Sequence, residues 1–245
     1  MTDQSEQQNI QASFDLTLKD SDLQNLGTDI AEIAIDSVLK DGALKDLPIV
    51  GTLVSLSKVG ANVHDRLFLK KIVCFLNPLR DVSAENRRLM IKNIDESKKY
   101  RIKVGEKLLY IIDKSDDYEK SELIGIVFKY FIEGNIEYDE FLEVASALNN
   151  LTIKDFKWFI KYKKYFNFSL DDIGSLIGSG LFNLHYEQID VRVSEQEDHK
   201  FITNPHPDKY KADVEGGGVD ADISRAGEII LEIFCKEYKK TKAIK

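Results

Sequence analysis

The fold is decided by the stretch from residue 43 to residue 75, which reads ALKDLPIVGTLVSLSKVGANVHDRLFLKKIVCF. Pro48 suits the first turn of a helix, because its missing N–H costs no hydrogen bond there. Apolar residues then recur at helical spacing and give the helix one broad apolar face: Ile49, Leu53, Val54 and Leu56. The pattern predicts an apolar helix that runs on to the end of the stretch and forms a buried hairpin at the centre of its domain.

The same helix is a candidate membrane or partner surface, because its polar side is thin. The residues that would form this surface are Ile49, Leu53, Val54 and Leu56. A membrane-spanning helix needs about 20 apolar residues, and the apolar run from Leu47 to Val63 is shorter and contains glycines. A transmembrane anchor is therefore disfavoured, and a buried hairpin is preferred over a membrane-active segment.

Composition places the chain among ordinary globular proteins. Hydrophobic residues make up 43% and charged residues 31% of its 245 positions. The N-terminus has no charged-then-apolar pattern with a cleavage site, so no secretory signal is predicted. Two cysteines do not make a disulfide framework, and Cys74 is expected in the core. A cytoplasmic location follows as an expectation.

Charge is distributed unevenly along the chain. Residues 1–50 hold ten acidic and three basic side chains, whereas residues 62–103 hold eleven basic and five acidic ones. The formal net charge of −8 makes nucleic acid a disfavoured partner. The basic segment nevertheless contains a candidate anion-binding patch, with a solvated helix face as the alternative: Arg87, Arg88, Lys92, Lys99 and Arg101.

The order of patterns predicts a mainly α protein, with a helical N-terminal domain followed by a small α+β module. Residues 1–20 are polar and predict a disordered tail. Residues 21–150 form the helical domain with the apolar hairpin. Residues 151–245 form the second module, in which alternation around Val191 and Val193 indicates strand and residues 194–219 are expected to be a long mobile loop.

No chemistry-bearing motif is found, so neither catalytic residues nor cofactor or metal ligands are predicted, and the chain is not expected to be an enzyme. Residues 129–140 resemble part of a calcium-binding EF-hand loop. Lys129 and Phe131 stand at its first and third ligand positions, and neither side chain coordinates a hard cation. This segment is therefore interpreted as a helix–turn–helix corner.

The C-terminal third resembles a winged-helix module. The similarity rests on an aromatic helix, a short helix ending at Gly178-Ser179-Gly180, a β-ribbon, and a final helix that starts at Ala221-Asp222-Ile223-Ser224-Arg225. Winged helices that bind DNA use a basic recognition helix and a basic wing. Residues 190–222, at the place of the wing, hold nine acidic and four basic side chains. The resemblance therefore implies a winged-helix fold and gives little support for DNA binding.

A wider resemblance covers three segments of the chain. Residues 44–52 with 65–71, Val104 to Leu109, and Gly134 to Phe141 are similar to a broad, loosely defined group of uncharacterised bacterial proteins. That group is associated with mobile elements and phage defence. The resemblance implies a biological context and carries no catalytic residues.

Three functional hypotheses follow. The leading one is a non-enzymatic bacterial protein-interaction module, in the context of phage defence, with a protein partner and with homo-oligomerisation left open. The second is a membrane-perturbing effector that uses the apolar helix of residues 48–63. The third is a winged-helix regulator that binds DNA.

Overall fold

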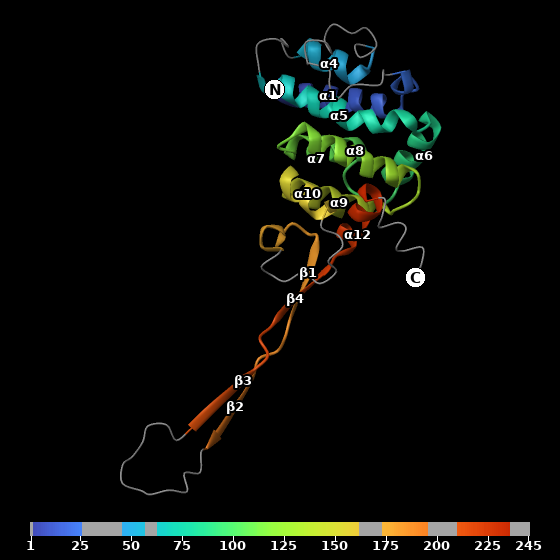
Figure 1. Cartoon of the computed structure of the whole chain (residues 1–245). Helices are drawn as coiled ribbons and strands as arrows, with labels where there is room; N and C mark the ends of the chain where they lie inside the picture. The colour runs from blue at the N-terminus through green and yellow to red at the C-terminus, as the bar shows by residue number, and fades with distance from the viewer. Residues whose placement is uncertain (1, 26–45, 57–62, 162–172, 196–209, 236–245) are drawn as a thin grey trace, which may run out of the picture.

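The computed structural model of the chain describes residues 2–25, 46–56, 63–161, 173–195 and 210–235. Its helical elements are α1 (Thr2–Lys19), η1 (Asp22–Asn25), α4 (Pro48–Leu56), α5 (Val63–Leu76), η2 (Asn77–Asp81), α6 (Ala84–Asp95), α7 (Val104–Lys114), α8 (Tyr118–Ile132), α9 (Tyr138–Asn150), α10 (Ile153–Lys161), η3 (Gly174–Leu176) and α12 (Arg225–Phe234). The strands are β1 (Phe182–Tyr186), β2 (Asp190–Glu195), β3 (Tyr210–Glu215) and β4 (Val219–Ile223). Figure 1 shows the helices stacked in layers from α4 to α12, and the strands as a narrow ribbon extending away from the last layer. The predicted class, mainly α with a small α+β module, is confirmed.

The N-terminal segment is a helix, so the prediction of a disordered tail over residues 1–20 is wrong. α1 buries Phe14 completely, and its ring lies 6.2 Å from that of Phe75 in α5, centroid to centroid. Thr17 is also buried, and its hydroxyl oxygen accepts a hydrogen bond from the Ile49 amide at 3.0 Å. Polar composition suggests disorder, but Ile10, Phe14 and Leu18 recur four residues apart. That spacing gives even a polar helix one face that docks on a core.

The apolar stretch forms two helices in the described part of the chain, α4 and α5, and residues 57–62 between them lie outside it. α4 begins at Pro48, as the sequence predicts. It packs against α1, where Ile49 and Leu53 enter the core. Cys74 of α5 is buried, which confirms its predicted place.

α5 and α8 cross closely at the centre of the stack (Figure 1). Gly125 of α8 lies against the main chain of α5, where an added Cβ would overlap the carbonyl oxygen of Phe75. The close approach lets the rings of Phe75 and Phe128 pack with their centroids 5.8 Å apart, and Phe128 reaches Phe141 of α9 at 5.1 Å. A run of aromatic contacts thus joins α1 to α9.

Arg87 of α6 ties the end of α1 to η2 from inside the protein. Its side chain has no exposed surface. Among the described residues, every hydrogen-bond acceptor of its guanidinium is a main-chain carbonyl oxygen. The acceptors on the α1 side are Leu18, at 2.8 Å, and Asp20; those on the η2 side are Leu79, at 3.0 Å, and Val82. Carbonyl groups at a helix end have no partner within the helix, so a buried end needs donors of this kind.

The corner between α8 and α9 is a helix–turn–helix, which confirms the interpretation of residues 129–140. Gly134 supplies the turn with a φ of 77°, a conformation that glycine adopts without strain. Glu137 and Glu140 then form a capping box at the start of α9. Lys129 pairs with Asp81 at 2.9 Å.

One cluster of buried hydrophobic residues runs through the described chain from Phe14 to Cys235. It crosses residue 150, where the sequence predicts a domain boundary, because α12 packs on α9. Phe156 of α10 and Phe234 of α12 meet edge to face with ring centroids 5.2 Å apart. The base of the ribbon therefore rests on the same core as the helical layers.

We expect Gly125→Ala to lower the free energy of unfolding by about 2–3 kcal/mol, because overpacking forces α5 and α8 apart. Urea denaturation followed by circular dichroism measures the change. Gly174→Ala is the matched control, since nothing lies within 4 Å of a Cβ at that position. Equal stability of the two variants would contradict the close crossing.

We expect Arg87→Leu to destabilise the protein by about 3 kcal/mol or more, because several buried carbonyl groups lose their donor. Arg88→Leu serves as control: its exposed side chain donates one hydrogen bond, to the Lys19 carbonyl at 2.7 Å. We expect it to cost about 1 kcal/mol or less. Thermal unfolding of both variants tests the difference, and a similar loss in both would refute the buried role of Arg87.

Candidate functional site

The predicted membrane or partner surface on α4 belongs largely to the core. Ile49 is completely buried and Leu53 nearly so, which contradicts a surface role for both. Val54 lies at the surface with 36% of its area exposed. Leu56 is the last residue of α4, and its side chain lies outside the described ones. Among the helices described, none has the length and apolar character needed to cross a bilayer.

One of the five residues of the predicted anion-binding patch is not at the surface. Arg87 is wrong as a member, because its guanidinium is buried and bound to carbonyl groups. Arg101 is exposed. The other three each meet a partner within the chain: Arg88 donates to the Lys19 carbonyl, Lys92 lies 3.8 Å from Glu96, and Lys99 pairs with Asp139.

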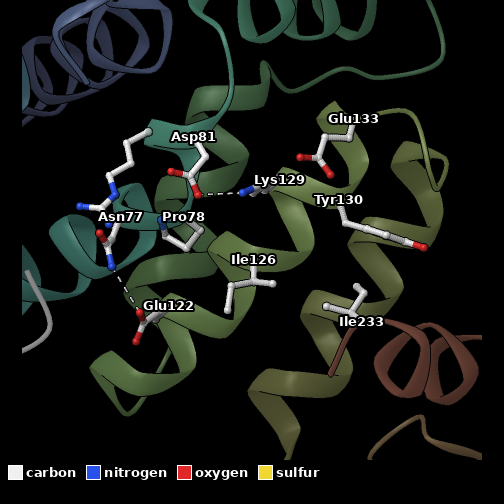
Figure 2. A pocket seen from close by; sticks show the side chains of 10 residues that line it. Asn77, Pro78, Asp81, Glu122, Ile126, Lys129, Tyr130, Glu133 and Ile233 are labelled. Atoms are coloured by element: carbon white, nitrogen blue, oxygen red, sulfur yellow. Dashed lines mark hydrogen bonds and ion pairs between the residues drawn. The ribbon is translucent and has the colours of Figure 1, made fainter. Parts of the chain in front are cut away.

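Figure 2 shows a cavity of about 340 Å³ between η2, α8 and the end of α12. Ile126 and Ile233 contribute to its apolar lining. Its rim carries the ion pair of Lys129 with Asp81, and Asn77 donates to Glu122 at 3.4 Å. These polar contacts fasten η2 to α8. The lining includes no serine, cysteine or histidine, so the cavity is a structural junction without a nucleophile of those kinds.

The β-ribbon is a more distinctive feature. β1 pairs with β4 and β2 with β3, both antiparallel. The residue numbers of each pair add up to 405 in both halves, as in Tyr186 with Val219 and Asp190 with Glu215. The amide of Glu187 donates to the carbonyl of Gly218 at 2.9 Å and continues the same register. The two sheets are therefore halves of one hairpin ribbon, about 45 Å long at the usual rise of a strand.

The two halves of the ribbon present their apolar residues differently. Directly opposed residues of an antiparallel pair share a face. In the half nearest the helices, apolar residues stand at even positions of β1, and Phe182 and Leu184 pack on the core. In the far half they stand at odd positions of β2, where Val191 opposes Val214 and Val193 opposes Ala212. The apolar pattern thus shifts by one position between the halves.

The apolar face of the far half is uncovered. We call Val191, Val193, Ala212 and Val214 the distal apolar face. Its three valines are 55%, 63% and 64% exposed, and Figure 1 shows β2 and β3 well beyond the helical layers. Single exposed apolar residues are ordinary, but a contiguous set on a projecting element marks an interaction surface. A free sheet edge with apolar side chains is also a liability that proteins usually avoid.

Glycines mark the junction between the halves. Gly216 and Gly217 have φ angles of 85° and 80°, which side-chain-bearing residues rarely adopt. A Cβ at Gly216 would also overlap the carbonyl oxygen of Gln188 on the opposite strand. The glycine run, which falls within the predicted mobile loop of residues 194–219, thus allows close approach of the two strands where the apolar pattern shifts.

The opposite face of the far half is polar and locally compensated. Asp190 and Glu215 oppose each other across the two strands, an arrangement of like charges that destabilises a ribbon. Arg192 stands beside them and lies 3.1 Å from Asp190 and 3.9 Å from Glu215. The acidic pair of the far half is thus compensated within the ribbon. Asn183, His185 and Asp222 belong to the other face, nearer the helices, where hydrogen bonds from the first two hold the pKa of Asp222 below its ordinary value.

The base of the ribbon is fixed where β1 and α12 meet. The amide of Ser224 donates to the Leu181 carbonyl at 2.8 Å, and its hydroxyl donates to the Gly180 carbonyl at 2.6 Å. Gly227 is needed at the first turn of α12, because a Cβ there would lie 2.7 Å from the Leu181 carbonyl oxygen. These contacts set the direction in which the ribbon leaves the helical layers.

Arg225 adds a second attachment between this base and the helical stack. Its guanidinium donates to Glu140 of α9 at 2.7 Å, and it also lies 3.3 Å from Glu228. The other carboxylate oxygen of Glu140 accepts from the Glu137 amide at 2.8 Å. The residue at the last ligand position of the EF-hand-like segment is thus engaged by a helix cap and an arginine.

Sequence reasoning located only part of this ribbon. The alternation of Val191 and Val193 correctly indicated strand. The prediction of a loop over 194–219 is wrong at residues 194–195, which end β2, at residues 210–215, which form β3, and at Val219, where β4 starts. Residues 196–209 lie outside the described chain. The missed signal is the matching alternation of Ala212 and Val214, which glycines and charged neighbours obscure.

Comparison with protein-family models, with curated proteins and with solved structures finds no match to this chain.

Protonation of Glu140 should weaken the ribbon base. The Glu137 amide and the Arg225 guanidinium hold the pKa of Glu140 below its ordinary value of 4.5. Its stabilising contribution is therefore present above pH 4.5 and is lost as pH falls through the folded-state pKa. We expect Glu140→Gln to be less stable than the wild type near pH 7 and the gap to narrow below pH 4.5. Urea titrations across this range measure it, and a gap independent of pH would contradict the assignment.

Proposed function

We propose that this chain is a non-enzymatic protein-interaction module that contacts its partner through the distal apolar face of the ribbon. The observation that carries the proposal is the set of half-exposed valines on a projecting element. Apolar side chains on such an arm gain free energy when a partner removes them from water, at about 25 cal/mol per Å² of buried area. The fixed base of the ribbon supports the same role, because a pre-oriented arm loses less entropy on binding.

The charge of the ribbon indicates the chemistry of the partner. Residues 182–195 and 210–223 together hold seven acidic and two basic side chains. A partner that presents an apolar strip flanked by lysine or arginine complements this surface in both respects. The phosphate backbone of nucleic acid does not, which disfavours the DNA-binding alternative.

The membrane alternative finds less support in the arrangement of α4. An effector acting through residues 48–63 would have to withdraw Ile49 and Leu53 from the core, where both are buried. That step costs about 1.5–3 kcal/mol for each large apolar side chain removed from the interior. The protein-interaction proposal requires no such rearrangement.

A photo-crosslinking amino acid at position 193 should trap the partner in the bacterial cell. We expect a discrete crosslinked species from Val193 and none from the neighbouring Ser194, because the two positions face opposite sides of the ribbon. Adding Val191→Asp should abolish the species, whereas Arg192→Ala on the polar face should preserve it. Both side chains are exposed, so neither substitution should unfold the chain.

The mass of the crosslinked species distinguishes the outcomes. A second protein supports the proposal, and twice the mass of the chain identifies a homo-oligomer formed through the same face. Equal crosslinking from positions 193 and 194, or insensitivity to Val191→Asp, would overturn the assignment of the interface. Turnover of a substrate by the purified chain would overturn the non-enzymatic part.

We also propose, from the resemblance to bacterial proteins of phage-defence neighbourhoods, that the interaction serves antiviral defence. The test is a plaque assay on bacteria that express the chain or its Val191→Asp variant. Protection by the wild type alone supports the proposal. Absence of protection in a host that also produces the crosslinked partner counts against it.

A further inference from the structure

A second site lies on the helical stack, away from the ribbon, where the connection between α6 and α7 meets the start of α9. It is a cavity of about 230 Å³. Tyr100, Ile102 and Leu142 give it apolar walls. Lys99, Arg101 and Lys107 stand around the same space. Cationic side chains around an apolar cavity form the pattern expected for an organic anion rather than for a bare ion.

Tyr138, the first residue of α9, also lines this cavity and carries an unusual hydroxyl group. The residue is only 3% exposed, and its ring meets Tyr100 edge to face with centroids 4.9 Å apart. The hydroxyl is shielded from solvent and has no hydrogen-bond partner within the described part of the chain. Burial raises the pKa of this phenol, so it is a neutral donor at neutral pH. A buried, unpaired hydroxyl costs about 1–3 kcal/mol, and this one is not accessible from the cavity.

The three cations differ in what they already bind. Lys99 pairs with Asp139, whose other carboxylate oxygen accepts from the Tyr100 hydroxyl at 2.7 Å. Lys107 lies over the ring of Tyr110, with its ammonium 5.4 Å from the centroid. Arg101 is exposed and makes no hydrogen bond or ion pair to any residue that the structure describes. Arg101 is therefore the most available group for an incoming anion.

The surrounding sequence strengthens the positive field at this place. The connecting segment from Ser97 to Lys103 carries four cationic side chains and no acidic one, in a chain whose net charge is −8. A guanidinium donates two parallel hydrogen bonds to a carboxylate, a geometry that an ammonium does not match. The size of the cavity is below the range of about 300–1,000 Å³ typical of drug-sized ligands, so it suits a single ring with one acidic group.

We propose that this cavity binds a small aromatic carboxylate, with the carboxylate on Arg101 and Lys107 and the ring against Tyr100, Ile102 and Leu142. This inference is independent of the proposed function of the ribbon, because the two surfaces share no residue.

Fluorine NMR with 4-fluorobenzoate tests the site directly on the full chain. We expect saturable line broadening with the wild type and a dissociation constant about tenfold higher for Arg101→Gln, which loses the bidentate contact. Lys98→Gln is the matched control, since it removes the same charge from the same segment without lining the cavity. The neutral analogue 4-fluorobenzamide should bind more weakly than the carboxylate.

Tyr138→Phe is a second control. Removing a hydroxyl that solvent does not reach should leave thermal stability unchanged or raise it, and binding of 4-fluorobenzoate should not change. Arg101 is exposed, so its variant keeps the test valid even if Tyr138→Phe misfolds. Absence of saturable binding by the wild type, equal binding by Arg101→Gln and Lys98→Gln, or full displacement by equimolar inorganic phosphate would each overturn the proposal.

Discussion

The structure depends on satisfying buried carbonyl groups where α1 ends against η2. A helix leaves its last carbonyl groups without internal partners, and at this end Arg87 supplies the donors from inside the core. The constraint also explains how the acidic segment of residues 1–50 contacts the basic segment of residues 62–103. Arg87 and Arg88 do reach the first segment, but there they bind the carbonyl oxygens of residues 18 to 20. Hydrogen bonds from these arginines to main-chain carbonyl groups therefore help to hold α1, a mostly polar helix, on the stack.

With α1 in place, close helix contacts carry the arrangement through to the ribbon. Gly125 allows α5 and α8 to touch, the turn at Gly134 brings α9 against α8, and α12 packs on α9. Arg225 and Ser224 then fix the point where β1 and β4 leave the core. Each of these contacts depends on a small residue or a helix cap where two elements meet. The direction of the ribbon therefore follows from the packing of the helical core. A projecting interaction surface is useful only when its base is held in this way.

The molecule keeps two groups in environments that cost stability. The distal apolar face leaves three valines in water, and the Tyr138 hydroxyl is buried without a partner in the described chain. Neither is needed to close the core, since one lies beyond it and a phenylalanine would fill the place of the other. Natural sequences break local rules of this kind most often at functional positions. The ribbon proposal rests on that reasoning. The two proposals concern opposite kinds of partner: a cationic apolar surface for the ribbon and a small anion for the cavity.

The sequence by itself determined most of the segments that become helices and where several of them begin, although it did not reveal α1. Pro48, Ser83, Thr152 and Ser224 each stand at a helix start, as their local chemistry requires. The apolar character of a free cysteine is enough to place Cys74 in the core. Spacing also identified β2, but it did not find β3, because the pairing partner is distant in the chain and the short alternation of Ala212 and Val214 lies among charged residues and ends at a run of glycines. The candidate residues were least predictable. Whether an arginine such as Arg87 faces water or a buried helix end, and whether Ile49 meets a partner or its own core, depends on which helices pack together. Helix packing is set by contacts between residues that are far apart in the sequence. The residue pattern of a single helix does not show which of these contacts form.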